Sequence, residues 1–112
     1  MNYLDLQDPR PIYEQITDMY RMLILKGAMK PDEPMPSVRK LAMELSTNPN
    51  TVQKAYTELE REGYIYSVKG RGNFVRENPD LREKKRKELK ERLDAIFKEA
   101  SDIGISREEL LK

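Results

Sequence analysis

Two short helical patterns, separated by a very short turn, constrain the fold of this chain more than any other feature. The first follows Ser37, a good N-cap, and the second begins at Asn48-Pro49, where asparagine caps the helix and proline suits its first turn. Only Ser46-Thr47 separates the two, and Gly63 ends the second. Apolar residues mark one face of each helix: Val38, Leu41, Ala42 and Leu45 in the first, and Val52, Ala55, Tyr56 and Leu59 in the second. This spacing is typical of a helix-turn-helix, whose second helix enters the major groove of DNA.

The residues before this pair predict one more helix. Apolar positions recur at helical spacing over residues 11–26, and Gly27 ends the helix. Residues 1–10 are expected to form an extended arm, and three prolines over residues 31–36 predict a loop.

The residues after the pair predict a hairpin. Residues 64–68 and 73–75 are β-type runs, and two glycines lie between them in Lys69-Gly70-Arg71-Gly72. Three helices followed by a hairpin predict a fold class that is mainly α (α+β), a winged helix-turn-helix with a small helical C-terminal region.

The last third of the chain predicts helices alone. A long helix opens at Asn78-Pro79 and breaks at Gly104, and Ser106 with Glu109 makes a capping box for a short final helix. A lone helix cannot bury the apolar stripe of Leu89, Leu93, Ile96 and Phe97, and Leu110 and Leu111 can cover only part of it. A second subunit is the expected cover. We therefore predict a DNA-binding domain over residues 1–76 and a dimerisation tail over residues 77–112.

Composition excludes several classes of function. The chain has no cysteine and no histidine, so thiol nucleophiles and the commonest general base and metal ligand are missing. We therefore expect that the protein is not an enzyme and that it has no cofactor and no metal site. No apolar run approaches the roughly 18 residues of a membrane span, and the first residues do not resemble a signal peptide, so a cytoplasmic protein without membrane contact is expected. The net charge is only +1, so DNA binding must depend on where the charges lie.

The second helix of the pair places polar side chains opposite its apolar face. Asn50 and Gln53 can read adenine edges, and Lys54 can reach phosphates or bases. Asn48 and Thr51 flank the helix N-terminus, where free N–H groups favour a phosphate. The three glutamates of this helix lie in its C-terminal half. This segregation favours docking of the N-terminal half on double-stranded DNA.

The hairpin loop adds a second signal. Gly70 and Gly72 let the backbone approach a partner closely, and Lys69 and Arg71 place two cations at the tip. An arginine there suits a narrow minor groove. Because glycines would form a tight turn in any hairpin, only the two cations favour a DNA contact.

Five motifs, in order, resemble the DNA-binding domain of the GntR family of bacterial regulators. They are Pro11–Ile16, Pro36–Ala42, Asn50–Val52 with Ala55-Tyr56, Leu59-Glu60 with Glu62-Gly63, and Gly70–Val75. The resemblance covers about residues 10–76. The run Asn48–Val52 and the short tail are similar to the YtrA-like subfamily, whose members carry a small helical dimerisation region.

The resemblance implies roles for further residues. Arg39 would donate to a guanine or to the DNA backbone. Many relatives have arginine at the positions of Pro49 and Gln53, so part of the base readout is expected to differ from theirs. The predicted DNA-binding residues are Ser37, Arg39, Asn48, Asn50, Thr51, Gln53, Lys54, Lys69, Gly70, Arg71 and Gly72. The predicted function is a sequence-specific transcription regulator, expected to be a repressor, that binds a palindromic operator as a homodimer.

Two alternatives stay open. A winged helix can also bind protein or RNA without operator specificity. The polar, acid-free face over residues 48–57 argues against a protein partner, because interface cores are rich in aromatic residues. The basic run over residues 82–92 is either a solvated face with ion pairs such as Glu83–Lys87 and Glu88–Arg92, which we favour, or an auxiliary DNA contact. The sequence defines neither the operator, the regulated genes nor a small-molecule effector.

Overall fold

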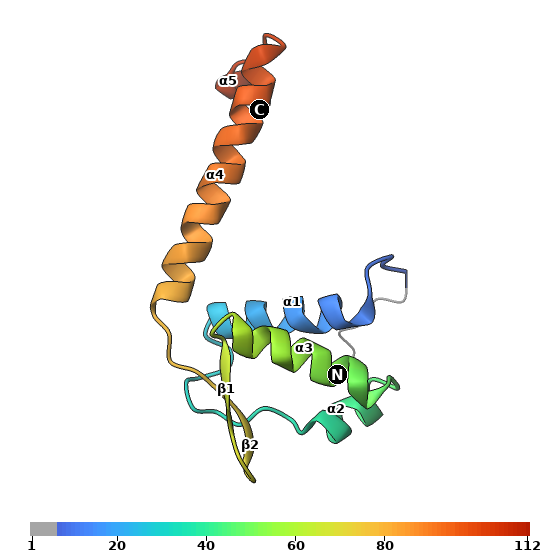
Figure 1. Cartoon of the computed structure of the whole chain (residues 1–112). Helices are drawn as coiled ribbons and strands as arrows, with labels where there is room; N and C mark the ends of the chain where they lie inside the picture. The colour runs from blue at the N-terminus through green and yellow to red at the C-terminus, as the bar shows by residue number, and fades with distance from the viewer. Residues whose placement is uncertain (1–6) are drawn as a thin grey trace. The chain divides into compact units, whose positions relative to one another are not determined.

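The computed structural model describes residues 7–112 and is mainly helical, with one two-stranded antiparallel sheet (Figure 1). The predicted order of three helices, a hairpin, a long helix and a short helix is confirmed. The chain divides into two compact units, Met1–Asn78 and Pro79–Lys112. Most of the arm that we expected over residues 1–10 lies outside the described residues.

Helix α1 spans Ile12–Leu25 and follows Pro11. Its polar residues Gln15 and Thr17 are buried but bonded: Gln15 donates to the carbonyl of Arg10 at 3.1 Å, and the Thr17 hydroxyl donates to the carbonyl of Tyr13 at 2.7 Å. Gly27, with φ +79°, ends the helical segment in the left-handed conformation that glycine adopts without strain.

Helices α2, Val38–Glu44, and α3, Pro49–Arg61, form the predicted helix-turn-helix. The backbone N–H of Thr47 donates to the carbonyl of Ala42 at 2.9 Å and closes the end of α2. Ser46 makes the turn with φ +52°, in the left-handed region that most residues avoid. The turn is therefore only a few residues long, as the sequence predicted.

The hairpin consists of β1, Ile65–Val68, and β2, Gly72–Val75, with Ile65 paired to Val75 and Val68 to Gly72. The proline-rich segment that we predicted to be only a loop also contacts this sheet. Pro34 forms an isolated antiparallel bridge with Phe74. The N–H of Met35 donates to the carbonyl of Asn73 at 2.8 Å. A cluster of prolines predicts a break in regular structure, but it does not predict which strand edge the chain then follows.

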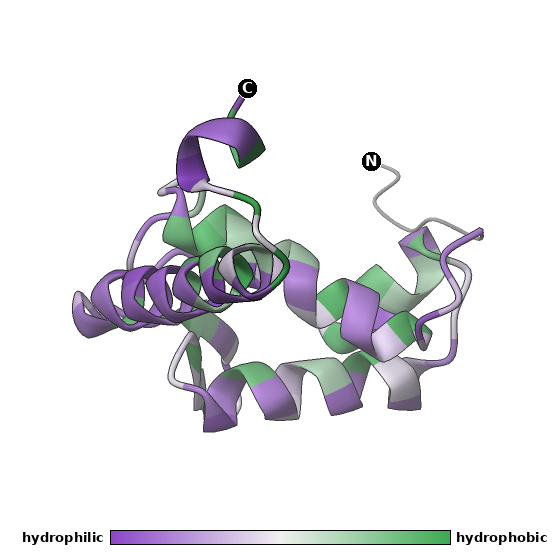
Figure 2. Ribbon diagram, turned by 90° about the horizontal axis from the view of Figure 1, so that it is seen from above, coloured by the Kyte–Doolittle hydropathy of each residue, from purple (hydrophilic) through white to green (hydrophobic). Residues whose placement is uncertain are grey.

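The core of the first unit lies where α1, α2 and β1 pack on α3. Its largest fully buried side chains include Tyr20, Tyr56, Ile16, Leu41 and Leu59. Tyr20 and Tyr56 meet edge to face, with ring centroids 6.1 Å apart and an interplanar angle of 88°. Burial of each such side chain stabilises the fold by about 1.5–3 kcal/mol. Figure 2 shows hydrophobic and hydrophilic residues interspersed along the helices of the first unit, as expected of amphipathic helices.

The second unit consists of α4, Asp80–Asp102, and α5, Arg107–Leu110. Gly104, with φ +81°, turns the chain, and the N–H of Ile105 donates to the carbonyl of Ala100 at 2.9 Å. The Ser106 side chain accepts from the N–H of Glu109, which is half of the predicted capping box. Ala100 is the one residue of this unit that is buried.

Candidate nucleic-acid interface

Helix α3 presents a polar surface opposite its buried apolar face. We call the exposed side chains of Asn50, Gln53, Lys54 and Thr57 the recognition surface. Gln53 is already ordered, because its amide nitrogen donates to the Thr57 hydroxyl at 3.2 Å. The helix turns this face outward because the apolar residues of α3 occupy the other side. The surface thus holds amide, ammonium and hydroxyl groups, which suit base edges and phosphates.

Ser37 and Asn48 have structural roles at the helix starts. The Ser37 hydroxyl accepts from the N–H of Lys40 at 3.1 Å, and the Asn48 carbonyl oxygen accepts from the N–H of Asn50 at 2.8 Å. Both are the N-caps that the sequence predicted. Ser37 keeps its hydroxyl hydrogen and Asn48 keeps its amide NH₂ group as further donors. Thr51, next along α3, is half-buried.

The carboxylates of α3 are engaged by partners at the C-terminal end of the helix. Glu58 accepts from Arg61, and this guanidinium lowers the pKa of Glu58 to about 2. The Ser67 hydroxyl donates to Glu60 at 2.7 Å, and Arg21 binds Glu62. These contacts hold the acidic groups at one end of the helix, and the first turns carry no acid.

Three of the four cations predicted to contact DNA lie outside α3, and all three are exposed. Arg39 lies on α2, and Lys69 and Arg71 lie in the hairpin loop. None of the three forms an ion pair with another residue in the range 7–112. Gly70 and Gly72 have φ values of +78° and +109°, so the tight loop requires glycine for its conformation. The loop therefore presents two cations on a short turn.

Three tertiary contacts of this unit were not predicted from the sequence. The Lys54 ammonium lies over the ring of Tyr13 on α1, 3.9 Å from its centroid. The Tyr66 hydroxyl donates to Asp32 at 2.7 Å, and the Tyr66 ring stacks on Phe74 with centroids 5.6 Å apart. Periodicity assigns each residue to a face of its own element, but it cannot show which residue of another element lies opposite.

The predicted dimerisation residues form an exposed apolar surface on the second unit. The exposed fractions of Leu89, Leu93 and Ile96 are 49%, 47% and 52%. Leu110 and Leu111 were expected to cover part of this stripe, but both are exposed. Phe97 is half-buried, and it is Arg107 that covers its ring, with the guanidinium carbon 4.4 Å from the ring centroid.

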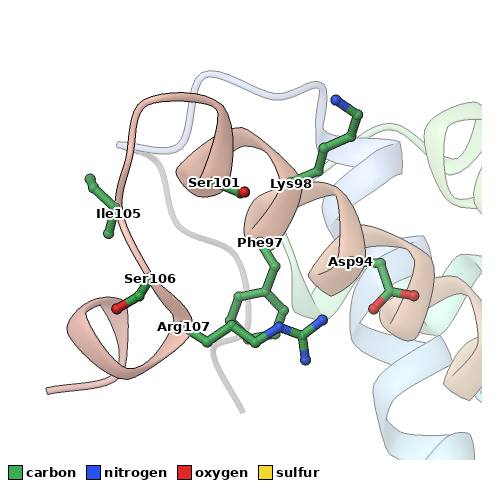
Figure 3. A pocket seen from close by; sticks show the side chains of 7 residues that line it. All are labelled: Asp94, Phe97, Lys98, Ser101, Ile105, Ser106 and Arg107. Atoms are coloured by element: carbon green, nitrogen blue, oxygen red, sulfur yellow. The ribbon is translucent and has the colours of Figure 1, made fainter.

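Phe97 and Arg107 belong to an open hollow at the junction of α4 and α5 (Figure 3). Its other lining residues are Asp94, Lys98, Ser101, Ile105 and Ser106. Most of these side chains are charged or carry a hydroxyl group, so the hollow lacks the apolar lining that is typical of small-molecule pockets.

Part of the basic run over residues 82–92 of α4 forms ion pairs along the helix. The pairs observed are Glu83–Arg86 at 2.7 Å, Lys85–Glu88 at 3.5 Å and Lys90–Asp94 at 3.3 Å. The partners we expected for Glu83 and Glu88, namely Lys87 and Arg92, are not the ones used. Both glutamates instead pair at a spacing of three residues, which is also a neighbouring position on a helix. All six paired side chains are exposed or half-exposed, as on a solvated face.

The described residues offer neither a metal site nor a membrane-spanning helix. Within residues 7–112, no group of three or more acidic, histidine or cysteine side chains could hold a metal ion. No helix in this part of the chain is long and apolar enough to cross a membrane.

Comparisons with known proteins agree with this geometry. The family model for bacterial regulatory proteins of the gntR family matches residues 12–75. The HTH-type transcriptional repressor YtrA of Bacillus subtilis is 46% identical over 112 residues, covering 98% of this chain and 86% of that protein. A solved transcriptional regulator from Oenococcus oeni superposes with a TM-score of 0.83 at 28% identity, covering 98% of this chain and 92% of that chain.

A solved protein–DNA complex is also similar. The DNA-binding domain of AraR, in complex with operator ORE1, superposes with a TM-score of 0.57 at 29% identity, covering 67% of this chain and 92% of that chain. The family model matches more than half of the chain, and YtrA matches nearly all of it. This chain therefore belongs to the GntR family of bacterial regulatory proteins, among its YtrA-like members, and is a DNA-binding transcription regulator and not an enzyme.

Proposed function

We propose that this protein is a repressor that binds a palindromic operator as a homodimer. The observation that carries the proposal is the acid-free recognition surface of α3, together with the cations of α2 and the hairpin loop, which form no ion pair within residues 7–112. The similar protein YtrA of Bacillus subtilis is named a repressor, and the AraR domain was solved with its operator. A regulator with this role would act on the chromosome, so we also propose a cytoplasmic location.

In the proposed complex, the N-terminal half of α3 enters the major groove. Asn50 and Gln53 would read base edges, because an amide can donate to and accept from adenine at once. Arg39 would donate to a guanine or to the backbone beside it. Thr51 and Lys54 would contact phosphates near the helix N-terminus, where free N–H groups add positive potential.

The capping residues would bind the DNA backbone without giving up their caps. The Asn48 amide NH₂ and the Ser37 hydroxyl hydrogen are both free to donate while their oxygens accept from the helix starts. Phosphate contacts of this kind fix the register of a protein on the duplex and carry no sequence information. Replacing either residue should therefore weaken binding to all sequences alike.

The hairpin would lie against the DNA beside the recognition helix. Lys69 and Arg71 flank Gly70, and Gly72 begins β2, so both cations sit on a backbone that can approach the duplex closely. Phosphates would account for both contacts, and a narrow, A·T-rich minor groove would favour Arg71 in particular.

The apolar stripe of α4 would pair two copies of the chain. Leu89, Leu93 and Ile96 are each about half exposed and lie within two turns of one another, and Phe97 extends the surface. Burial against the same stripe of a second subunit would remove this area from water, and a two-fold dimer matches the two half-sites of a palindrome. Leu110 and Leu111, exposed on the final turn, would join the same interface.

Salt dependence distinguishes DNA binding from the protein- or RNA-binding alternative. Duplexes selected from a random pool with the full-length protein should bind it with an affinity that falls steeply as salt rises, because lysine and arginine release counterions from phosphates. Structured RNA of the same length should bind weakly. A protein that prefers the RNA, or that selects no common duplex sequence, would contradict the proposal.

Sedimentation of two forms of the protein tests the dimer. The full chain should sediment as a dimer, and a form truncated after Asn78 should be a monomer that binds a palindrome far more weakly, because linked half-sites gain from effective concentration. The double variant Leu93→Ala/Ile96→Ala should behave as the truncated form does. A monomeric full chain, or a truncated form that still dimerises, would show that the tail is not the dimerisation element.

A further inference from the structure

We infer that Tyr13 on α1 is a positioning residue for DNA binding, because its ring holds the Lys54 ammonium in place on the recognition surface. The Lys54 nitrogen lies 3.9 Å from the centroid of the Tyr13 ring. The inference rests on the proposed function, because it explains how one side chain of the DNA-binding surface is kept in position. It extends the DNA-binding machinery to a helix that lies outside the helix-turn-helix.

Packing of α1 on α3 brings these two residues together. Tyr13 is the second residue of α1 and is half-buried, so its ring is fixed by its surroundings more firmly than an exposed side chain is. Among the described residues, its hydroxyl has one contact, a long one to Glu14 at 3.4 Å, and this contact leaves the ring face open to Lys54. The negative face of an aromatic ring attracts an ammonium group at this distance.

The ammonium remains able to bind a phosphate while it lies over the ring. Lys54 is exposed, and within residues 7–112 it forms no ion pair with a carboxylate. The ring covers one side of a group that has three donors, so donors remain for an anion. The charge is therefore held in position without being neutralised.

Pre-ordering of Lys54 should strengthen binding. A lysine side chain has four flexible methylene groups, and its immobilisation at an interface opposes association. The contact with Tyr13 orders the chain before DNA arrives, so less freedom is lost on binding. The neighbouring Gln53 is ordered in the same way by its bond to Thr57. Two adjacent positions of the recognition surface are thus held in place within the free protein.

A double-mutant cycle on the full-length protein tests the inference. The variants are Tyr13→Leu, Tyr13→Phe, Lys54→Ala and the double variant Tyr13→Leu/Lys54→Ala, each titrated with a labelled duplex that the wild-type protein selects. Tyr13→Leu should weaken binding about 2- to 5-fold, the range expected for loss of an exposed cation–π contact. Tyr13→Phe keeps the ring and should bind as the wild type does. Lys54→Ala should weaken binding and lower the salt slope by about one.

The decisive comparison is the effect of Tyr13→Leu with and without Lys54. If the tyrosine acts through the lysine, adding Tyr13→Leu to Lys54→Ala should not weaken binding further. An equal loss in both backgrounds would overturn the inference, since Tyr13 would then act through the fold or through its own DNA contact. Tighter binding by Tyr13→Leu would overturn it too, because the ring would then be keeping the Lys54 ammonium away from the DNA.

Failure of the proposed function gives a different result. If the wild-type protein selects no duplex, the proposed function and the inference fall together. If it selects a duplex but Lys54→Ala binds as tightly as the wild type, only the inference fails. Thermal unfolding of each variant, measured alongside, separates a change in the recognition surface from a loss of fold. If Tyr13→Leu is unfolded, weaker binding by a folded Tyr13→Phe would overturn the inference, because that variant keeps the ring.

Discussion

Arg21 and Glu62 join α1 to the end of α3 through two parallel hydrogen bonds. The Arg21 Nε donates to Oε1 of Glu62 at 2.7 Å, and Nη2 donates to Oε2 at 2.6 Å. The side chains are 29% and 23% exposed, so water screens the pair only in part. This bidentate pair fixes the C-terminal end of the recognition helix to the helix that packs behind it.

Loss of this pair should destabilise the first unit. We expect Arg21→Ala to lower the free energy of unfolding by about 1.5–3 kcal/mol, because Glu62 would keep its charge without its main partner. The matched control is Arg61→Ala on α3. The Arg61 guanidinium forms the same kind of bidentate pair with Glu58 and lies 3.7 Å from Glu62, but it is exposed, so its loss should destabilise the fold much less. Urea denaturation of the full chain measures both. Equal effects of the two variants would show that partial burial of the Arg21–Glu62 pair adds nothing to stability.

Tyr56 should make the protein sensitive to alkali. Burial, with a further contribution from the neighbouring Tyr20, raises the pKa of the Tyr56 phenol well above its usual range, and its hydroxyl donates to the carbonyl of Pro36 at 2.8 Å. The unfolded chain releases this proton near pH 10, whereas the folded chain retains it. Stability from this group is therefore fully present below about pH 10 and is lost as the pH rises above it, by up to about 1.4 kcal/mol per pH unit.

The variant Tyr56→Phe isolates this effect. It should be less stable at neutral pH by about 1 kcal/mol, because a hydrogen bond is lost. Above pH 10 its free energy of unfolding should fall less steeply than that of the wild type, since all other titrating groups are the same in both proteins. Denaturation curves between pH 8 and 11 test the prediction, and parallel pH profiles would contradict it.

The hairpin loop should contribute to affinity for all sequences. Replacing Lys69 and Arg71 together by alanine should weaken binding and lower the salt slope by up to about two, if both cations contact phosphates. The matched control, Lys84→Ala/Lys87→Ala, removes two exposed cations from α4 and should leave the slope unchanged if that face is only solvated. A double variant of the loop with unaltered affinity and slope would remove the hairpin from the interface.

The helices and the hairpin could be predicted from the sequence because their signals are local. Ser37, Asn48 and Gly63 mark helix ends by their own chemistry, and apolar spacing assigns the buried face of α3 without knowledge of its partners. The exposed positions of the candidate site followed from the same spacing, since the face opposite a buried stripe must point outward.

The contacts that the sequence did not predict are those that join distant elements. Pro34 pairs with Phe74, Tyr66 bonds to Asp32, and Lys54 lies over Tyr13. Each contact depends on how two elements pack, and no local sequence pattern within one element specifies that geometry. The ion pairs of α4 could not be predicted individually either, because residues at both i+3 and i+4 lie next to a given residue on a helix.

The affinity of Arg39→Ala for a selected duplex is the most direct test of whether α2 and α3 read a specific DNA sequence. Arg39 is exposed on α2, so its removal should leave the melting temperature unchanged. Binding to the selected operator should weaken by about 1–3 kcal/mol, with a smaller loss on a scrambled duplex, if the guanidinium reads a guanine. The control Lys26→Ala, which removes an exposed cation at the end of α1, should bind as the wild type does. Unchanged affinity of Arg39→Ala for the operator would contradict the assignment of this surface as the site of sequence recognition.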